Sequence, residues 1–119
     1  MYGGWRPVAE EKALTIDYVF ERMIDLAWEH DKISKKRLLG ARRDNELVIW
    51  RCAISYFLKA YNQPLKTIAR KLRKANHATI INLLKKVQQV LDKPYYDPEL
   101  YRVYKIVEKD LLRQGILPK

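Results

Sequence analysis

The chain has 119 residues, 48% of them hydrophobic, which suits one domain with a buried core and excludes a chain that is disordered throughout. Lys and Arg number 24 against 14 Asp and Glu, and the net charge of +10 favours a polyanionic partner. No apolar run is longer than residues 47–50 and no secretory signal is visible, so we expect a cytoplasmic protein that does not bind a membrane.

The first predicted helix covers about residues 15–30, where apolar residues recur at steps of three and four and so share one helical face. This face consists of Ile16, Val19, Phe20, Met23, Ile24, Ala27 and Trp28. Thr15 is the expected N-cap of the helix. Ser34 then begins a short helical turn that ends at Gly40.

Three longer segments and one short one complete the helical pattern. The most apolar helix is predicted over residues 45–61, and its composition favours a central position. Pro64 begins a short helix over residues 65–72, and Asn76 is expected to cap a longer helix. The last helix is predicted to end at Gly115. No stretch of alternating apolar and polar residues is long enough to predict a strand. The sequence therefore predicts an all-α fold class, a compact domain of about six helices.

The short helix, the turn after it and the next helix have the lengths of a helix-turn-helix unit. In such a unit the exposed first turn of the second helix faces the DNA major groove, and here that turn consists of Asn76, His77, Ala78 and Thr79. The basic residues around it, which are suited to neutralise phosphates, are Lys66, Arg70, Lys71, Arg73, Lys74, Lys85 and Lys86. The alternative is a plain helical hairpin with a solvated basic rim.

Charge is unevenly distributed along the chain. Residues 1–31 hold seven acidic and three basic side chains, whereas residues 59–93 hold nine basic side chains and Asp92 as their one acid. A solvated surface usually mixes the two signs. The predicted helix-turn-helix therefore lies in the most electropositive part of the sequence.

No set of residues predicts catalysis or metal binding. Cys52 is the one cysteine, and with His30 and His77 it cannot form a zinc site rich in Cys and His. Cys52 lies among apolar residues and is interpreted as a small buried side chain rather than a nucleophile. We therefore expect a protein that is not an enzyme and that has no metal and no cofactor.

Two stretches resemble the helix-turn-helix of the C-terminal DNA-binding domain, domain IV, of the bacterial replication initiator DnaA. They are residues 64–69 and residues 76–80, the latter resembling the family signature Asp-His-Thr-Thr-Val. The resemblance extends to residues 14–17, to residues 38–39 and to Arg42 and Arg43, and it covers about residues 14–113. It implies an all-helical fold related to the Trp repressor.

The resemblance also implies roles for individual residues. His77 and Thr79 match family residues that contact bases in the major groove. Arg42 and Arg43 match a basic loop that places an arginine in the minor groove. Lys85 and Lys86 match basic positions on the recognition helix, and Trp50 and Arg51 fall near polar and basic phosphate contacts of the family. The chain departs from the family pattern at Ala75, Asn76 and Ala78 and has Arg73 and Lys74 where the family has a glycine pair, which implies a different preferred DNA sequence.

These inferences lead to one predicted architecture and one predicted function. Residues 14–113 form a single DNA-binding domain between tails of residues 1–13 and 114–119, with no ATPase module. We expect a monomer that binds double-stranded DNA in a sequence-specific manner, in the control of replication or transcription. The alternative is a helical adaptor whose basic face binds an acidic protein. Its contact area would come from Tyr95, Tyr96, Tyr101 and Tyr104, which fit better as partly buried packing groups.

Overall fold

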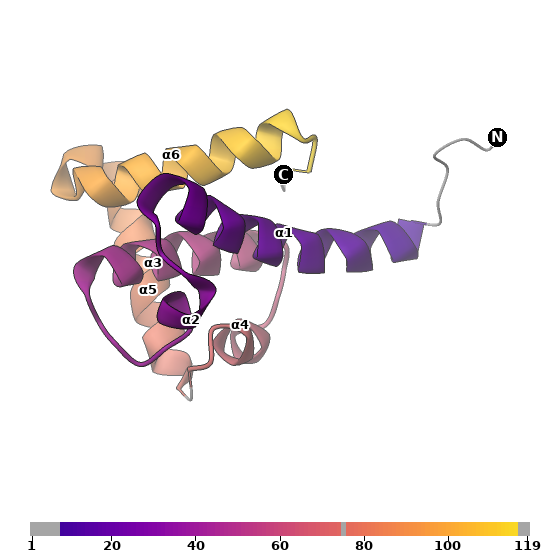
Figure 1. Ribbon diagram of the computed structural model, residues 1–119, viewed down its shortest axis with the longest axis horizontal. Helices are drawn as coiled ribbons and strands as arrows, with labels where there is room; N and C mark the ends of the chain where they lie inside the picture. Colours follow the sequence, from indigo (N-terminus) through magenta and orange to yellow (C-terminus); the bar gives the residue numbers. More distant parts are fainter. Residues whose placement is uncertain (1–7, 75, 117–119) are drawn as a thin grey trace.

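Every secondary-structure element of the computed structural model is helical in the part of the chain that it describes, residues 8–74 and 76–116 (Figure 1). The elements are α1 (Val8–Asp31), α2 (Lys35–Leu38), α3 (Asn45–Ala60), α4 (Leu65–Lys71), α5 (His77–Asp92), the 3₁₀ helix η1 (Pro94–Tyr96) and α6 (Pro98–Arg113). The predicted all-α fold class with about six helices is confirmed. Ala75 and the outer parts of both predicted tails lie outside the described residues.

Helix α3 is the centre of the domain, as its composition predicted. It packs against α1, α2, α4, α5 and α6. Trp50 and Phe57 are among its fully or almost fully buried side chains, and the indole Nε1 of Trp50 donates a 2.7 Å hydrogen bond to Asp31 at the end of α1. This bond satisfies the one polar atom of a large buried side chain, so α1 is fixed to α3 by both apolar and polar contacts.

Helix α1 differs from its prediction at its start and on its buried face. It begins at Val8 rather than near Thr15, because the intervening Ala, Glu, Lys and Leu residues are good helix formers. Trp28 is 54% exposed, and the prediction that it faces the core is wrong. Leu26 is buried instead, because it lies two helical turns after the buried Val19 and therefore on the same face.

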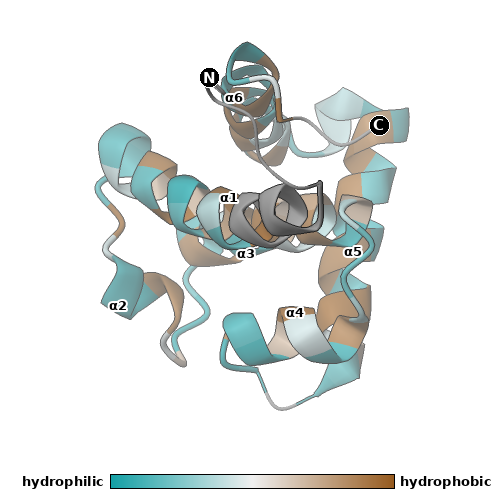
Figure 2. Ribbon diagram, turned by 90° about the vertical axis from the view of Figure 1, so that its right-hand side faces the viewer, coloured by the Kyte–Doolittle hydropathy of each residue, from teal (hydrophilic) through white to brown (hydrophobic). Residues whose placement is uncertain are grey.

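Helices α4 and α5 are joined by a short turn, and α4 lies across the first part of α5 (Figure 1). The turn requires a positive φ of 57° at Arg73. The side-chain oxygen of Asn76 accepts a 2.7 Å hydrogen bond from the backbone N–H of Ala78, which confirms Asn76 as the N-cap of α5. Hydrophobic and hydrophilic stretches alternate along α5 (Figure 2), so one side of the helix packs on the core and the other faces solvent.

The four C-terminal tyrosines divide into two pairs. Tyr104 is buried and stacks on Phe57 with ring centroids 5.3 Å apart, and Tyr101 is half-buried beside it. Tyr95 and Tyr96 in η1 are exposed. The prediction of packing groups is confirmed for the first pair and is wrong for the second.

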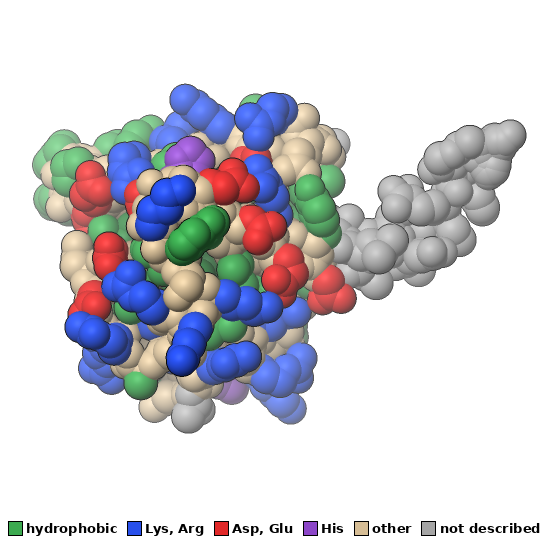
Figure 3. Space-filling model, viewed as in Figure 1, with side chains coloured by type: hydrophobic (Ala, Val, Ile, Leu, Met, Phe, Trp, Pro, Cys, Tyr) green, Lys and Arg blue, Asp and Glu red, His purple; other side chains and the backbone are tan. Residues whose placement is uncertain are grey.

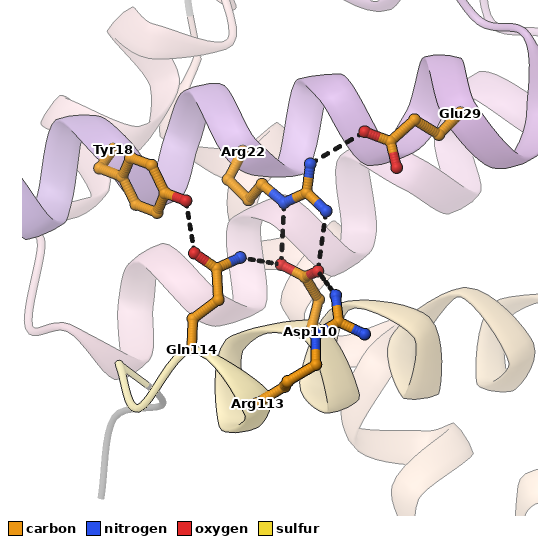
Figure 4. A network of polar contacts seen from close by, with 6 residues as sticks. All are labelled: Tyr18, Arg22, Glu29, Asp110, Arg113 and Gln114. Atoms are coloured by element: carbon orange, nitrogen blue, oxygen red, sulfur yellow. Dashed lines mark hydrogen bonds and ion pairs between the residues drawn. The ribbon is translucent and has the colours of Figure 1, made fainter.

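A polar network joins α1 to α6 (Figure 4). Asp110 is buried and accepts two hydrogen bonds from the Arg22 guanidinium, at 3.0 and 2.8 Å, and further bonds from Arg113 and Gln114. Gln114 in turn accepts a hydrogen bond from the Tyr18 hydroxyl. Gln114 follows the last residue of α6, so the first residue of the predicted C-terminal tail belongs to the packed domain.

Replacing Asp110 with Asn should lower the free energy of unfolding at neutral pH by about 2 kcal/mol, because the charged acceptor at the centre of the network is lost. The hydrogen bonds from Arg22 hold the pKa of Asp110 below its ordinary value, so the unfolded chain binds a proton there at a higher pH than the folded chain does. The stabilisation by Asp110 is therefore fully present above about pH 4 and decreases as the pH falls further.

Urea unfolding at a series of pH values measures both effects. The Asp110→Asn variant should lose less stability than the parent chain below about pH 4. Asp25, which is exposed on α1, offers the control substitution Asp25→Asn. An Asp110→Asn variant with the stability and acid profile of the parent chain would contradict this role of the network.

Candidate functional site

A groove of about 720 Å³ lies between the α2–α3 loop and the first three turns of α5. We call it the cationic groove. Its polar lining consists of Arg43, Arg51, Arg73, Lys74, Asn76, Thr79, Asn82 and Lys86. The loop, the turn before α5 and α5 itself are thus brought together around one space, and none of the described residues that line it is acidic. Seven of the predicted site residues belong to this lining.

Helix α5 contributes its polar side chains to the groove from one face. Thr79, Asn82 and Lys86 follow one another at steps of three and four residues, which places them on a single side of the helix. Asn82 is exposed and was missed by the sequence analysis, which considered only the first turn of α5. The same spacing rule that identified the apolar faces would have found it. A carboxamide presents both a donor and an acceptor, so this face offers several hydrogen-bonding groups beside the cations.

Arg51 is buried in the structure, and its position does not support the predicted phosphate contact. Its side chain is 3% exposed, and its guanidinium donates hydrogen bonds to backbone carbonyls at the end of α2 and in the α2–α3 loop. The acceptors are the oxygens of Leu38 at 2.8 Å, Arg42 at 2.6 Å, Gly40 at 3.0 Å and Arg37 at 3.3 Å. Burial lowers the pKa of the Arg51 guanidinium, and four carbonyl oxygens compensate for the water that it has lost.

Lys74 is held by the same loop from the opposite side of the groove. Its ammonium Nζ donates a 2.7 Å hydrogen bond to the carbonyl oxygen of Gly40. Burial lowers the pKa of the Lys74 ammonium, and the neighbouring charges of Arg51 and Arg43 act in the same direction. The ammonium is therefore directed at the backbone of the loop, and the predicted contact of Lys74 with a phosphate would have to replace this bond.

Lys71 faces the acidic helix α1 instead of the cationic groove. Its Nζ lies 3.3 Å from a carboxylate oxygen of Asp17 and 5.1 Å from the centroid of the Phe20 ring. The side chain is 21% exposed. These contacts fix the side chain between α4 and α1, so its predicted role as a phosphate contact is not supported by its position.

Of the two arginines in the α2–α3 loop, only Arg43 lines the cationic groove. Arg43 is exposed and lines the cationic groove. Arg42 is 76% exposed, lies outside the groove lining and forms an ion pair with Asp44 at 3.3 Å. Because the backbone carbonyl of Arg42 is bound by Arg51, the base of the loop is fixed while both guanidinium groups extend from it.

The remaining predicted residues are exposed on α4 and α5. Lys66 and Arg70 lie on α4, and His77, Ala78 and Lys85 lie on α5 outside the groove lining. On the face shown in Figure 3, Lys and Arg side chains cover the lower part of the molecule, where α2 and α4 lie, and acidic side chains lie above them. Some cations of α2 and α4 are nevertheless paired with acids, such as Lys35 with Glu21 and Lys71 with Asp17.

The described residues give no other indication of a chemical centre. No cluster of His, Cys, Asp and Glu among them is suited to hold a metal ion. None of the described helices is long and apolar enough to cross a membrane. Comparison with known protein families, with characterised proteins and with solved structures finds no match to this chain. The interpretation of the cationic groove therefore depends on its own residues and geometry.

Cys52 should be unreactive in the folded protein. It is 1% exposed, and burial raises the pKa of its thiol to about 12, so the reactive thiolate is scarce at neutral pH. A disulfide reagent that releases a coloured thiolate should therefore label the unfolded chain in urea rapidly and the native chain only at the rate of unfolding. Rapid labelling of the native chain at pH 8 would show that this side chain is accessible.

Proposed function

We propose that this protein binds double-stranded DNA in a sequence-specific manner, with the first turns of α5 in the major groove and the α2–α3 loop at the adjacent minor groove. The observation that carries the proposal is the cationic groove, in which a basic loop and the start of a polar-faced helix flank the same space. A recognition helix beside a basic arm is a known way to read two neighbouring DNA grooves.

The positive charges on α4, on α5 and in the turn between them suit a phosphate backbone. Lys66, Arg70, Arg73, Lys85 and Lys86 are all exposed on α4, on α5 or in the turn between them. Each exposed cation that neutralises a phosphate releases a counterion from the DNA, which favours binding. Arg42 and Arg43 suit a narrow, A/T-rich minor groove, where the negative potential is concentrated.

The exposed and half-buried groups in the first two turns of α5 suit base recognition. His77, Thr79 and Asn82 carry hydrogen-bonding side chains, and an asparagine amide matches the adenine edge in the major groove. Ala78 offers a methyl group for contact with thymine. The resemblance to domain IV of DnaA supports the same assignment, as a monomer that acts on DNA in the cytoplasm, in the control of replication or transcription.

A second candidate function is an adaptor that binds a protein partner. The observation that favours it is the pair of exposed tyrosines, Tyr95 at 71% and Tyr96 at 61%. They follow the last residue of α5, about 24 Å along the helix from its first turn. A protein bound there would leave the cationic groove open, so this function also fits a protein that binds DNA.

Salt titration of binding to a duplex tests the proposed function. If the five exposed cations of α4, α5 and their turn each neutralise one phosphate, the logarithm of the binding constant should fall against the logarithm of the salt concentration with a slope of about −4.5. Fluorescence anisotropy with a duplex chosen from a random library measures this slope. A binding constant that does not change with salt would contradict the proposal and favour the adaptor.

Substitutions on α5 and α4 separate base recognition from phosphate contact. His77→Ala and Thr79→Ala should reduce the discrimination between the selected duplex and a scrambled one by about 1 to 3 kcal/mol, because direct base contacts are lost. Lys66→Ala should weaken binding to both duplexes equally, since phosphates carry no sequence information. Parallel titrations of the two duplexes measure the difference. Equal losses for both duplexes in the His77 and Thr79 variants would show that this turn does not read bases.

A further inference from the structure

We infer that Lys74 and Arg51 are positioning residues that fix the α2–α3 loop to the start of α5, so that the protein measures the register between a minor-groove site and the adjacent major-groove site. The inference rests on the proposed function for the part that concerns DNA. The fixing of the loop is a property of the free protein and is tested without DNA.

The Gly40 carbonyl is the point at which the two sides of the groove meet. Its oxygen accepts a hydrogen bond of 3.0 Å from Arg51 on α3 and one of 2.7 Å from Lys74 in the turn before α5. A single backbone oxygen thus joins the central helix, the basic loop and the turn of the predicted helix-turn-helix. The position of Gly40 is itself tight, because a Cβ atom there would lie 3.1 Å from the carbonyl oxygen of Lys36.

The hydrogen bonds to the Gly40 oxygen hold cations that would otherwise repel one another. The pKa of Lys74 is lowered by burial and by the nearby Arg51 and Arg43, so three cations lie close together on one side of the loop. Like charges at short range repel each other, and the repulsion is stronger where water is excluded. Backbone carbonyls are the groups that hold the Arg51 and Lys74 cations in place. Without the Lys74 bond, the loop loses its only described side-chain connection to the turn before α5.

A fixed loop limits which DNA sites fit. Successive base pairs are spaced by about 3.4 Å, so moving an A/T-rich tract by one base pair displaces the narrow minor groove by more than the length of a hydrogen bond. A loop fixed to α5 cannot follow this displacement and loses its contact. A loose loop would follow it at little cost. The spacing between the two parts of the site should therefore be part of what the protein recognises.

The test compares two substitutions that remove the same charge. Lys74→Met removes the bond to Gly40 and keeps the aliphatic stem, and Lys85→Met removes an exposed cation of α5. Each variant is titrated with the selected duplex and with a duplex in which the A/T-rich tract is moved by one base pair. The parent chain should bind the shifted duplex about tenfold more weakly, in line with the usual loss for one mismatched position. In Lys74→Met this ratio should fall below about threefold, with the salt slope nearly unchanged.

The Lys85→Met control should behave in the opposite way. Its salt slope should become less steep by about 0.9, and the tenfold ratio between the two duplexes should remain. If Lys74→Met instead loses about 0.9 of the slope and keeps the ratio, Lys74 is a phosphate contact and the inference is overturned. Arg51→Lys, which keeps the charge but has fewer donors for the four carbonyls, should lower the ratio as Lys74→Met does.

Hydrogen exchange of the free protein separates this inference from the proposed function. In Lys74→Met the backbone amides of Leu39 and Gly40, which donate hydrogen bonds to the carbonyls of Lys35 and Arg37, should exchange at least tenfold faster, while those of α3 and α6 keep their protection. Unchanged exchange at Leu39 and Gly40 would show that Lys74 does not fix the loop, whether or not the protein binds DNA. Faster exchange in a protein that binds no duplex would overturn the proposed function and the measurement of register, and the fixing of the loop would stand.

Discussion

The burial of Arg51 is the constraint on which the path of the chain around α3 depends. A guanidinium has five N–H donors and stays charged in proteins, so it can lie in an interior only where oxygen atoms surround it. The end of α2 and the α2–α3 loop together supply four backbone oxygens within 3.3 Å. Removing the side chain would leave these carbonyls without their donor, and removing the loop would leave a buried charge. Each therefore requires the other, and the loop follows one path.

A second polar network of the domain lies away from the candidate site. The bonds of Asp110 to Arg22 join α1 to α6, and neither residue lines the cationic groove. A groove without acidic lining residues is disfavoured by repulsion among its cations. Because the core around α3 and the contacts between α1 and α6 stabilise the fold, the groove can keep unfavourable charges that suit a polyanion. Local conflicts of this kind are typical of functional sites.

The helices could be predicted from the sequence because their apolar residues follow the helical period and Ser34, Asn76 and Gly115 mark helix ends. The position of individual polar side chains could not, because tertiary contacts decide it. In the sequence, a buried arginine such as Arg51 looks the same as an arginine that contacts a phosphate. Only the carbonyl groups around it in the fold distinguish the two. Lys71 likewise differs from Lys66 through its contact with Asp17, which lies 54 positions earlier in the chain. Such long-range pairs leave no periodic signal.

The separation of acids on α1 from cations on α4 and α5 gives the molecule an electric dipole. Asp17, Glu21, Asp25 and Glu29 are exposed on α1, whereas the opposite sign prevails around the cationic groove. A polyanion within a screening length, about 10 Å at 0.1 M salt, therefore exerts a torque that turns the α4–α5 side towards it before any contact forms. Orientation is a main reason why association is slower than diffusion. If the chain binds DNA as proposed, the acidic helix therefore raises the rate of capture, although it repels the polyanion itself.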